Sequence, residues 1–243
     1  MSWQQTYAKK LVSVEEAAAA VKSHDRVWYP PCGSAPVGVI EALTRRAAEL
    51  EDVTMITGLV LYPLEYLKGS YKGHLNHHTI FMGPFERRAF PEGNVEVTSY
   101  QFAQTDWLTV NRIKANVFMA EVSPPDENGY MSYGPLGTFN GDIAAKTADT
   151  IIVQVNREAP YVYGDAHSFI HVDDVTLICE QDHKVGELQQ PPVTDIEKQI
   201  AAHIVEYIED GSTIQIGLGG VANAVGFFLE NHKDLGVHTE MLV

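Results

Sequence analysis

The sequence predicts an α/β fold, with an open parallel or mixed sheet that carries helices on both faces and is followed by the beginning of a second, similar α/β domain. Near the N-terminus, a helix, a strand, a small-residue loop, a helix and a strand follow one another. The same order recurs near the C-terminus, which is typical of an internal repeat. Between them, apolar runs such as "NVFMAEVSP" and "DTIIVQVN" indicate buried strands.

The first helix is predicted from a capping box in "SVEE", where Ser13 and Glu16 have the required spacing, and we expect it to run to about residue 23. Residues 26–29 then read as a buried strand, and "CGSAP" as a loop of small residues. The next segment, "PVGVIEALTRRAAEL", predicts a helix with Pro36 in its first turn. The apolar run "VTMITG" predicts the following strand.

A Gly-, Pro- and Asn-rich segment, "PPDENGYMSYGPLGTFNGD", is predicted to be a loop, and a loop of this length in a compact domain is usually functional. Asp126, Glu127 and Asn128 precede Gly129 in it as turn residues, although they could also line a cleft. After it, "VDDVTLICE" predicts a third buried strand of the central region.

The second unit begins at another capping box, formed by Thr194 and Glu197 in "TDIE". A strand ("STIQIGL"), a glycine loop ("GGVAN"), a helix ("AVGFFLENHKD") and a strand ("GVHTE") follow. Its first helix carries an apolar stripe at helical spacing, made of Ile196, Ile200, Ile204, Tyr207 and Ile208.

These elements predict a first α/β domain at residues 1–187, a linker at 188–194 and the start of a second α/β domain at 195–243. The second part is too short to bury a parallel sheet on both faces. Either another polypeptide supplies the missing part, or the chain is a fragment of a longer one. A half-finished sheet also makes association with other chains the expected state, and we expect a homo-oligomer.

The composition excludes several classes of protein. The chain has 243 residues, a formal net charge of -15 and a pI near 5.0, which disfavour nucleic acid and anionic membranes as partners. Its N-terminal residues lack the apolar core of a signal peptide, so we expect a cytoplasmic protein. Its two cysteines, Cys32 and Cys179, form neither a disulfide framework nor a zinc pattern.

The histidines are more easily explained by structural roles than by chemistry. His74, His77 and His78 could bring two imidazoles together, but no carboxylate ligand stands beside them, so we expect a polar loop or subunit surface and no metal. His167 and His171 flank "SFI" and are predicted to be hydrogen-bonded residues near the start of a strand.

The strongest local motif is "QIGLGGVANAV". Gly217, Gly219 and Ala222 fit G-x-G-x-x-A between a strand and a helix, and Glu240 lies where an acidic ribose ligand would follow, as in a dinucleotide-binding enzyme. The same residues could form a tight turn without a ligand. They could also form a loop whose amides hold an oxyanion beside a nucleophilic Glu240, which needs no general base because it is ionised at neutral pH.

The sequence resembles the acetyl-CoA hydrolase/transferase family, and most closely its 4-hydroxybutyrate and butyryl-CoA:acetate CoA-transferases. The resemblance covers essentially the whole chain and rests on "EVSPPDENGYMSYG", "YGDAHSFIHVDDV", "DGSTIQIGLGGVANAV" and "DLGVHTEM". It implies a CoA-transferase-like fold, in which Glu240 forms a glutamyl-CoA thioester and Ser34 or Ala35 offers a backbone N–H to the thioester oxygen. The implied coenzyme A contact loop is Gly217, Leu218, Gly219, Gly220 and Val221.

The resemblance implies a ping-pong transfer of coenzyme A between a short-chain acyl-CoA and a small carboxylic acid of the acetate, butyrate or 4-hydroxybutyrate class. Coenzyme A would be a substrate, with no permanently bound cofactor. The near alternative is an acyl-CoA hydrolase, and the distant one is part of an NAD-dependent dehydrogenase. Two further segments could contribute: residues 58–66, "GLVLYPLEY", as an acyl pocket, and His238, which alternation places on the same side of a strand as Glu240.

Overall fold

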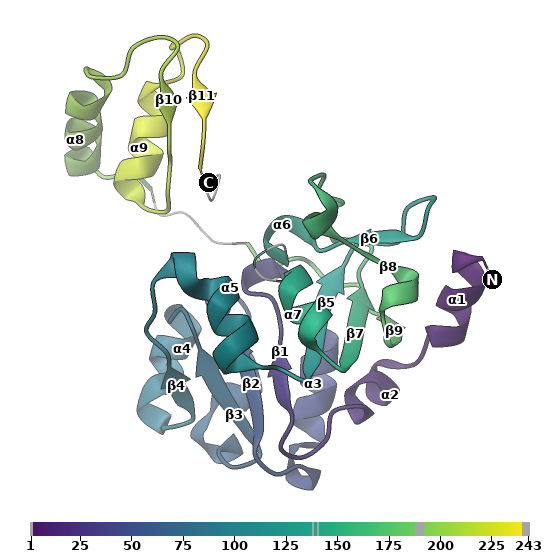
Figure 1. Ribbon diagram of the computed structural model, residues 1–243. Helices are drawn as coiled ribbons and strands as arrows, with labels where there is room; N and C mark the ends of the chain where they lie inside the picture. The colour runs from purple at the N-terminus through teal and green to yellow at the C-terminus, as the bar shows by residue number, and fades with distance from the viewer. Residues whose placement is uncertain (1, 138, 140, 188–191, 240–243) are drawn as a thin grey trace. The chain divides into compact units, whose positions relative to one another are not determined.

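The structure is a computed structural model that describes residues 2–137, 139, 141–187 and 192–239 (Figure 1). The chain divides into two compact units, Met1–Glu187 and Leu188–Val243, and each is considered by itself.

The first unit is built on a seven-stranded sheet with the order β4-β3-β2-β1-β5-β7-β9. Every neighbouring pair of strands is parallel, which confirms the predicted α/β class and decides for a parallel rather than a mixed sheet. Strand β5 is buried at all 6 positions, as expected of a strand covered on both faces. The strands are β1 (Arg26–Trp28), β2 (Val53–Thr57), β3 (Leu75–Thr79), β4 (Val95–Val97), β5 (Val117–Val122), β7 (Thr150–Val155) and β9 (Leu177–Glu180).

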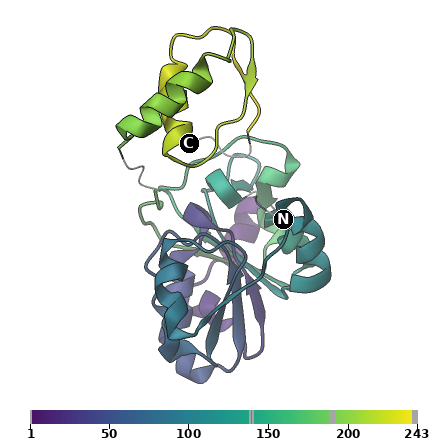
Figure 2. The same ribbon diagram turned by 90° about the vertical axis from the view of Figure 1, so that its left-hand side faces the viewer.

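Helices cover both faces of this sheet (Figures 1 and 2). On one face, α2 and α3 contribute Ala17, Val39 and Leu43 to a buried apolar cluster. On the other face, α7 contributes Ala144 and Ala145 to a second cluster. The helices described in this unit are α1 (Trp3–Lys10), α2 (Val14–Ala19), α3 (Val37–Arg45), α4 (Pro84–Ala89), α5 (Thr105–Leu108), α6 (Gly134–Gly137) and α7 (Gly141–Thr147).

The capping box predicted at Ser13 is present at the start of α2. The N–H of Glu16 donates to Ser13 Oγ (3.2 Å), and the N–H of Ser13 donates to Glu16 Oε2 (2.9 Å). The helix ends at Ala19, earlier than predicted, and the N–H of Lys22 donates to the side chain of Asp25 (2.7 Å) instead of to a helix carbonyl.

The predicted loop after β5 contains regular structure. The carboxylate of Asp126 accepts the N–H groups of Asn128 and Tyr130, both at 2.9 Å, which is the expected turn chemistry. The chain then forms strand β6 (Tyr130–Ser132), which pairs antiparallel with β8 (Phe169–His171) and leads into α6.

The segment "HLNHHT" lies in strand β3, so its prediction as a polar loop or subunit surface was wrong. Alternate residues Leu75, His77 and Thr79 are buried, because a strand directs successive side chains to opposite faces. His77 Nδ1 is hydrogen-bonded to the Tyr66 hydroxyl (2.7 Å), which also bonds the Tyr29 hydroxyl (2.6 Å). Burial lowers the pKa of His77 to about 3, so this network holds a neutral ring.

The second unit is a helix followed by a parallel strand–helix–strand arrangement. Thr213 pairs with Gly236 and Ile214 with Val237. The elements are α8 (Asp195–Val205), β10 (Thr213–Ile214), α9 (Gly220–Phe228) and β11 (Gly236–Val237). This agrees with the predicted start of a second α/β domain.

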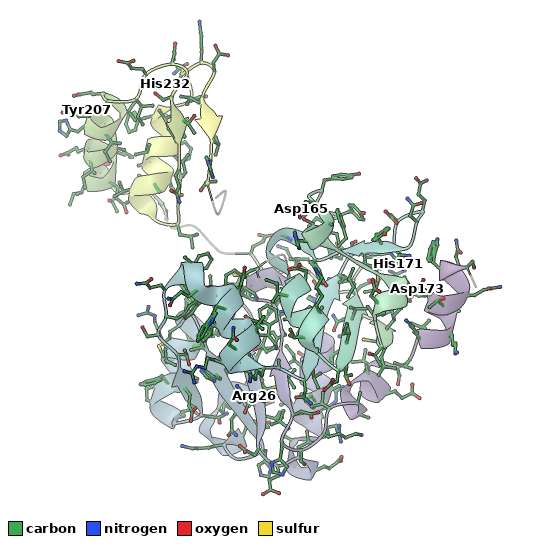
Figure 3. All side chains as sticks on the ribbon, viewed as in Figure 1. Arg26, Asp165, His171, Asp173, Tyr207 and His232 are labelled. Carbon is green, nitrogen blue, oxygen red and sulfur yellow. The ribbon has the colours of Figure 1, made fainter. Side chains whose placement is uncertain are left out.

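The apolar stripe of α8 is mostly uncovered within the second unit. Ile196 is 70% exposed, and Tyr207, near the end of α8 (Figure 3), is 87% exposed. Phe227 on α9 is 73% exposed. Two short strands cannot cover these side chains, so the second unit presents apolar surface of the kind that another element normally buries.

Candidate active site

The glycines between β10 and the first turn of α9 are required for different structural reasons. Gly219 is the N-cap of α9 and has φ 137° and ψ 157°, a conformation that is essentially restricted to glycine. A Cβ atom on Gly220 would lie 1.8 Å from Glu197 Oε1, so Gly220 permits close packing. Among the described residues, no atom apart from the adjoining chain lies within 4 Å of a Cβ position on Gly217 or Gly219. The described part of the chain therefore leaves room beside the backbone of this loop.

The predicted coenzyme A residues span the end of the loop after β10 and the start of α9. Gly217, Leu218, Gly219, Gly220 and Val221 run from just after β10 into the first turn of α9. The side chain of Leu218 is 42% exposed, and helix N-termini present N–H groups that favour anions.

The chain leading to the predicted nucleophile runs beside this loop. The N–H of His238 donates to the carbonyl of Ile214 (2.9 Å), and the hydroxyl of Thr239 donates to the carbonyl of Ile216 (2.8 Å). Ile216 immediately precedes Gly217. Glu240, which follows Thr239 in the sequence, lies outside the described residues.

The second set of predicted residues lies at the carboxyl end of β1, where the strand order reverses between β1 and β5. Ligands of open α/β sheets bind at such switch points. The turn Cys32–Ser34 is buried, and Ser34 Oγ donates to the carbonyl of Tyr133 (3.0 Å). Ala35, with 3% of its surface exposed, ends this turn. The predicted loop is therefore a fixed element of the first unit.

Backbone strain marks the same edge of the sheet. Cys32 has φ 56° and Leu59 has φ 45°, which are unusual for side chains of this kind. The N–H of Cys32 donates to the carbonyl of Leu59 (3.2 Å), and the N–H of Leu59 donates to that of Phe81 (2.7 Å). The turns after β1, β2 and β3 are thereby linked in a row. Strain of this kind persists only where the surroundings hold it, and it concentrates at functional sites.

A buried carboxylate, that of Glu86, binds backbone N–H groups in the turns after β2 and β3. Glu86 is fully buried and accepts the N–H groups of Val60 (3.0 Å) and Gly83 (3.1 Å). Burial raises the pKa of Glu86, while these backbone bonds act against that shift. Glu86 thus holds the segment after β2 in place.

A pair of ionisable residues that the sequence did not reveal lies at the ends of β5 and β9. The Glu121 carboxylate contacts His183 Nε2, and Gln154 Nε2 donates to the same carboxylate (3.3 Å). Glu121 is 2% exposed, and burial raises its pKa, while the bond to Glu121 raises the pKa of His183. The available signal was a glutamate inside the apolar run "NVFMAEVSP".

Tyr62 contacts both the turn after β1 and the segment after β9. Its hydroxyl lies 3.3 Å from the carbonyl oxygen of Gly33 and 2.8 Å from the backbone nitrogen of Gly186. Its ring meets that of His183 edge to face, with centroids 5.7 Å apart. The segment 58–66, predicted as an acyl-pocket candidate, therefore does reach the loop of the first unit.

The other candidate histidines make structural contacts with segments that are distant in the sequence. His167 Nδ1 contacts the Asp142 carboxylate, and His171, labelled in Figure 3, lies with its Nε2 3.0 Å from the carbonyl of Asn128. Within the described ranges, no three His, Cys, Asp or Glu side chains are grouped so as to hold a metal ion. No helix in the described part of the chain is long and apolar enough to cross a membrane.

The fold is that of a CoA-transferase-like α/β protein. Residues 1–188 match the model of the acetyl-CoA hydrolase/transferase N-terminal domain, and the chain belongs to this family. This confirms the resemblance read from the sequence motifs.

Individual relatives extend the match along the chain. The 4-hydroxybutyrate coenzyme A transferase of Clostridium kluyveri is 34% identical over 243 residues, and the butyryl-CoA:acetate CoA-transferase of Anaerostipes caccae is 35% identical over 249. Each alignment covers 100% of this chain and 56% of the relative, so the chain spans about half the length of these curated relatives. The crystal structure of RipA from Yersinia pestis superposes with a TM-score of 0.93 at 26% identity, covering 100% of this chain and 58% of RipA.

Proposed function

We propose that the complete gene product containing this chain is a CoA-transferase that moves coenzyme A between a short-chain acyl-CoA and a small carboxylate of the acetate, butyrate or 4-hydroxybutyrate class. Family membership and the names of the two CoA-transferase relatives support this reaction type. The substrate class follows the same relatives.

The proposal rests on one observation: the residues that precede Glu240 are hydrogen-bonded to the residues that lead into the glycine loop. The hydroxyl of Thr239 is bonded to the carbonyl of Ile216, which precedes Gly217, and the described residues leave room beside Gly217 and Gly219. A nucleophile and a group of backbone donors are needed together for acyl transfer, and this arrangement supports both from one strand–loop–helix unit.

In the proposed mechanism, the Glu240 carboxylate attacks the carbonyl carbon of the acyl-CoA thioester. The tetrahedral intermediate expels the coenzyme A thiolate and leaves an acyl–glutamyl anhydride. The thiolate then attacks the glutamyl carbonyl, which releases the first carboxylate and leaves a glutamyl-CoA thioester. The second carboxylate reverses these steps and leaves as the new acyl-CoA.

Each tetrahedral intermediate carries an oxyanion, and backbone N–H groups are proposed to stabilise it. The candidates are the loop Gly217–Val221 and the N–H of Ser34 or Ala35. One such donor is typically worth about 3 kcal/mol of the barrier. The N-cap geometry of Gly219 and the burial of the turn Cys32–Ser34 support donors that are positioned before substrate binds.

The proposed partners follow from the uncovered second unit. The exposed apolar side chains of α8 and α9 support a role for the remainder of the second domain, or for a second polypeptide, in covering them. A homo-oligomeric, cytoplasmic enzyme is part of the same proposal. Coenzyme A is a substrate in it and not a resident cofactor.

The test is intact-mass spectrometry of the complete gene product after incubation with butyryl-CoA. We expect a species heavier by coenzyme A less one water, with peptide mapping that places the adduct on Glu240, and release of the adduct by acetate. Loss of thioester without any acceptor acid would instead indicate the hydrolase. NADH binding that coenzyme A does not compete with, together with no adduct, would favour the dinucleotide reading of the glycine loop.

A further inference from the structure

The hydroxyl of Tyr62 occupies a position between two backbone groups that are distant in the sequence. One is the carbonyl of Gly33, in the turn after β1, and the other is the N–H of Gly186, in the segment after β9. A Cβ atom on Gly33 would lie 2.8 Å from Val185 Cγ1 and 3.2 Å from the carbonyl oxygen of Gly186. The turn and the later segment therefore pack directly against each other, with Tyr62 bonded to both.

The direction of these two hydrogen bonds is fixed by their chemistry. The Gly186 N–H can only donate, so it donates to the Tyr62 oxygen, and the hydroxyl proton is then directed to the Gly33 carbonyl. Burial raises the pKa of Tyr62 to about 12, so the hydroxyl keeps its proton at neutral pH. Hydrogen bonds in such a chain strengthen one another.

The carbonyl that Tyr62 holds belongs to the same peptide unit as the Ser34 N–H. A trans peptide is planar, and its C=O and N–H point in opposite directions. Fixing the Gly33 carbonyl on Tyr62 therefore also fixes the direction of the Ser34 N–H. That N–H makes a bond of 3.4 Å to the Pro31 carbonyl, and the bond from the Tyr62 hydroxyl to the Gly33 carbonyl is 3.3 Å. Both are longer than usual, since N–H···O bonds typically measure about 2.7–3.2 Å and O–H···O bonds about 2.5–3.0 Å. The Gly33–Ser34 peptide is thus held by two long bonds, and the Tyr62 hydroxyl supplies one of them.

The backing of Tyr62 is rigid. Its ring lies edge to face against His183, and His183 contacts the buried carboxylate of Glu121. The backbone at His183 is held as well, since the side-chain amide of Asn156 donates to the carbonyl of His183 (2.8 Å). Packed aromatic and ionic contacts of this kind keep a side chain in one rotamer.

We propose that Tyr62 is a positioning residue that orients and polarises the Gly33–Ser34 peptide so that the Ser34 N–H can stabilise the oxyanion of acyl transfer. This inference rests on the proposed function, because the oxyanion is that of the CoA-transfer reaction. It deepens that function by assigning the orientation of one donor to a side chain that follows β2.

The experiment compares four forms of the complete gene product: wild type, Tyr62→Phe, Gly33→Ala and the control Tyr7→Phe. The control likewise removes a tyrosine hydroxyl that is hydrogen-bonded within the first unit, since Tyr7 donates to Glu180 Oε1 at 2.6 Å. Steady-state CoA transfer, single-turnover formation of the coenzyme A adduct and amide hydrogen exchange over residues 30–36 are measured for each. Rates are expressed per active enzyme, counted by the adduct, so that a loss of folded protein does not count as a loss of catalysis.

For Tyr62→Phe we expect kcat and the single-turnover rate to fall about tenfold, less than the 100-fold or more typical of deleting a donor outright. KM for acyl-CoA should stay within about twofold. Exchange over residues 30–36 should become faster, and Tyr7→Phe should match wild type in all three readouts. Gly33→Ala, which pushes the turn from Val185, should also lower kcat.

An unchanged kcat in Tyr62→Phe, with wild-type transfer intact, would overturn this inference while leaving the proposed function standing. Unchanged hydrogen exchange would overturn it as well, because the hydroxyl would then not restrain the peptide. A wild type that neither transfers coenzyme A nor forms the adduct would remove the proposed function, and with it the catalytic role assigned to Tyr62.

Discussion

The two loops that follow the first strand of each unit differ in how they are held. The turn Cys32–Ser34 is buried, and it is hydrogen-bonded to the hydroxyl of Tyr62 and to the backbone carbonyl of Tyr133. For the loop at Gly217–Gly220, the described residues leave room beside Gly217 and Gly219, whereas Gly220 packs against Glu197. The first loop is thus closely packed within its own unit, and the second is less closely packed by the residues that the structure describes.

This difference separates two physical roles. In the first unit, seven parallel strands and two buried clusters provide the rigidity on which strained residues such as Cys32 and Leu59 depend. In the second unit, two short strands leave α8 and α9 with exposed apolar side chains. Substitutions at the buried supports of the first unit should therefore change mainly stability, whereas those in the glycine loop and at Glu240 should change mainly activity.

The largest expected effect is at Glu240. Glu240→Ala in the complete gene product should lower CoA transfer by at least about a thousandfold, because no nucleophile remains to form the thioester. The melting temperature should not change measurably, and the matched control Glu230→Ala, at an exposed position of the same unit, should keep wild-type activity. Transfer retained in Glu240→Ala would show that the adduct forms elsewhere or not at all.

The next effect tests the rigidity of the first unit. Glu121→Leu leaves His183 without its buried carboxylate, and breaking a buried pair in this way typically costs about 3 kcal/mol of unfolding free energy. Since Trp3, Trp28 and Trp107 all lie in the first unit, tryptophan fluorescence during urea unfolding reports on this unit.

The double variant Glu121→Leu/His183→Leu serves as the control for that measurement. It should recover part of the loss, because no unpaired charge remains. A single variant as stable as wild type would mean that the pair does not hold the ends of β5 and β9 together.

A smaller effect compares two glycines of the same loop. Gly219→Ala forces a Cβ into a conformation that costs about 1–3 kcal/mol, whereas Gly217→Ala places the same atom in open space at an ordinary backbone angle. We expect Gly219→Ala to weaken transfer by about tenfold or more, with Gly217→Ala much closer to wild type. Equal losses of activity in the two variants would mean that backbone strain at Gly219 is not the cause. A ligand that occupies the space beside both glycines would then explain the losses.

Local signals in the sequence were sufficient for much of the fold. The capping boxes at Ser13 and Thr194 and the apolar runs at β5 and β7 predicted the α/β class, because each depends on neighbouring residues alone. The order of elements also predicted a second strand–helix–strand unit. The roles given to Glu240, the glycine loop and Ser34 came from the family's motifs and stay predictions.

The contacts that hold the first loop could not be predicted. Glu121 and His183 are brought together by the pairing of β5 with β7 and of β7 with β9. Tyr62, which follows β2, meets Gly186, which follows β9, across the carboxyl ends of the strands between them. Such contacts depend on tertiary structure. His77 was misjudged because its polar neighbours hid the alternation of β3, in which the buried imidazole is satisfied by Tyr66.

That histidine supplies the smallest predicted effect. Burial lowers the pKa of His77 to about 3 in the folded chain, whereas an unfolded histidine titrates near 6.5. The unfolded state therefore gains a proton below about pH 6.5 that the folded state does not, and folding stability falls as the pH drops toward 3. Lowering the pH from 7 to 5.5 should cost the first unit about 1 kcal/mol through this residue.

The measurement is urea unfolding followed by tryptophan fluorescence at both pH values. His77→Gln should be less stable at each pH but should lose this part of the pH dependence, whereas His203→Gln, at an exposed site in the second unit, should retain it. The raised pKa of His183 acts in the opposite sense, since its contribution is complete below about pH 6.5 and is lost as the pH rises through its folded value. A pH dependence unaltered by His77→Gln would mean that the buried network of β3 accepts a proton after all. The core of the first unit would then admit a charge, and would be less rigid than the strained turn at Cys32–Ser34 implies.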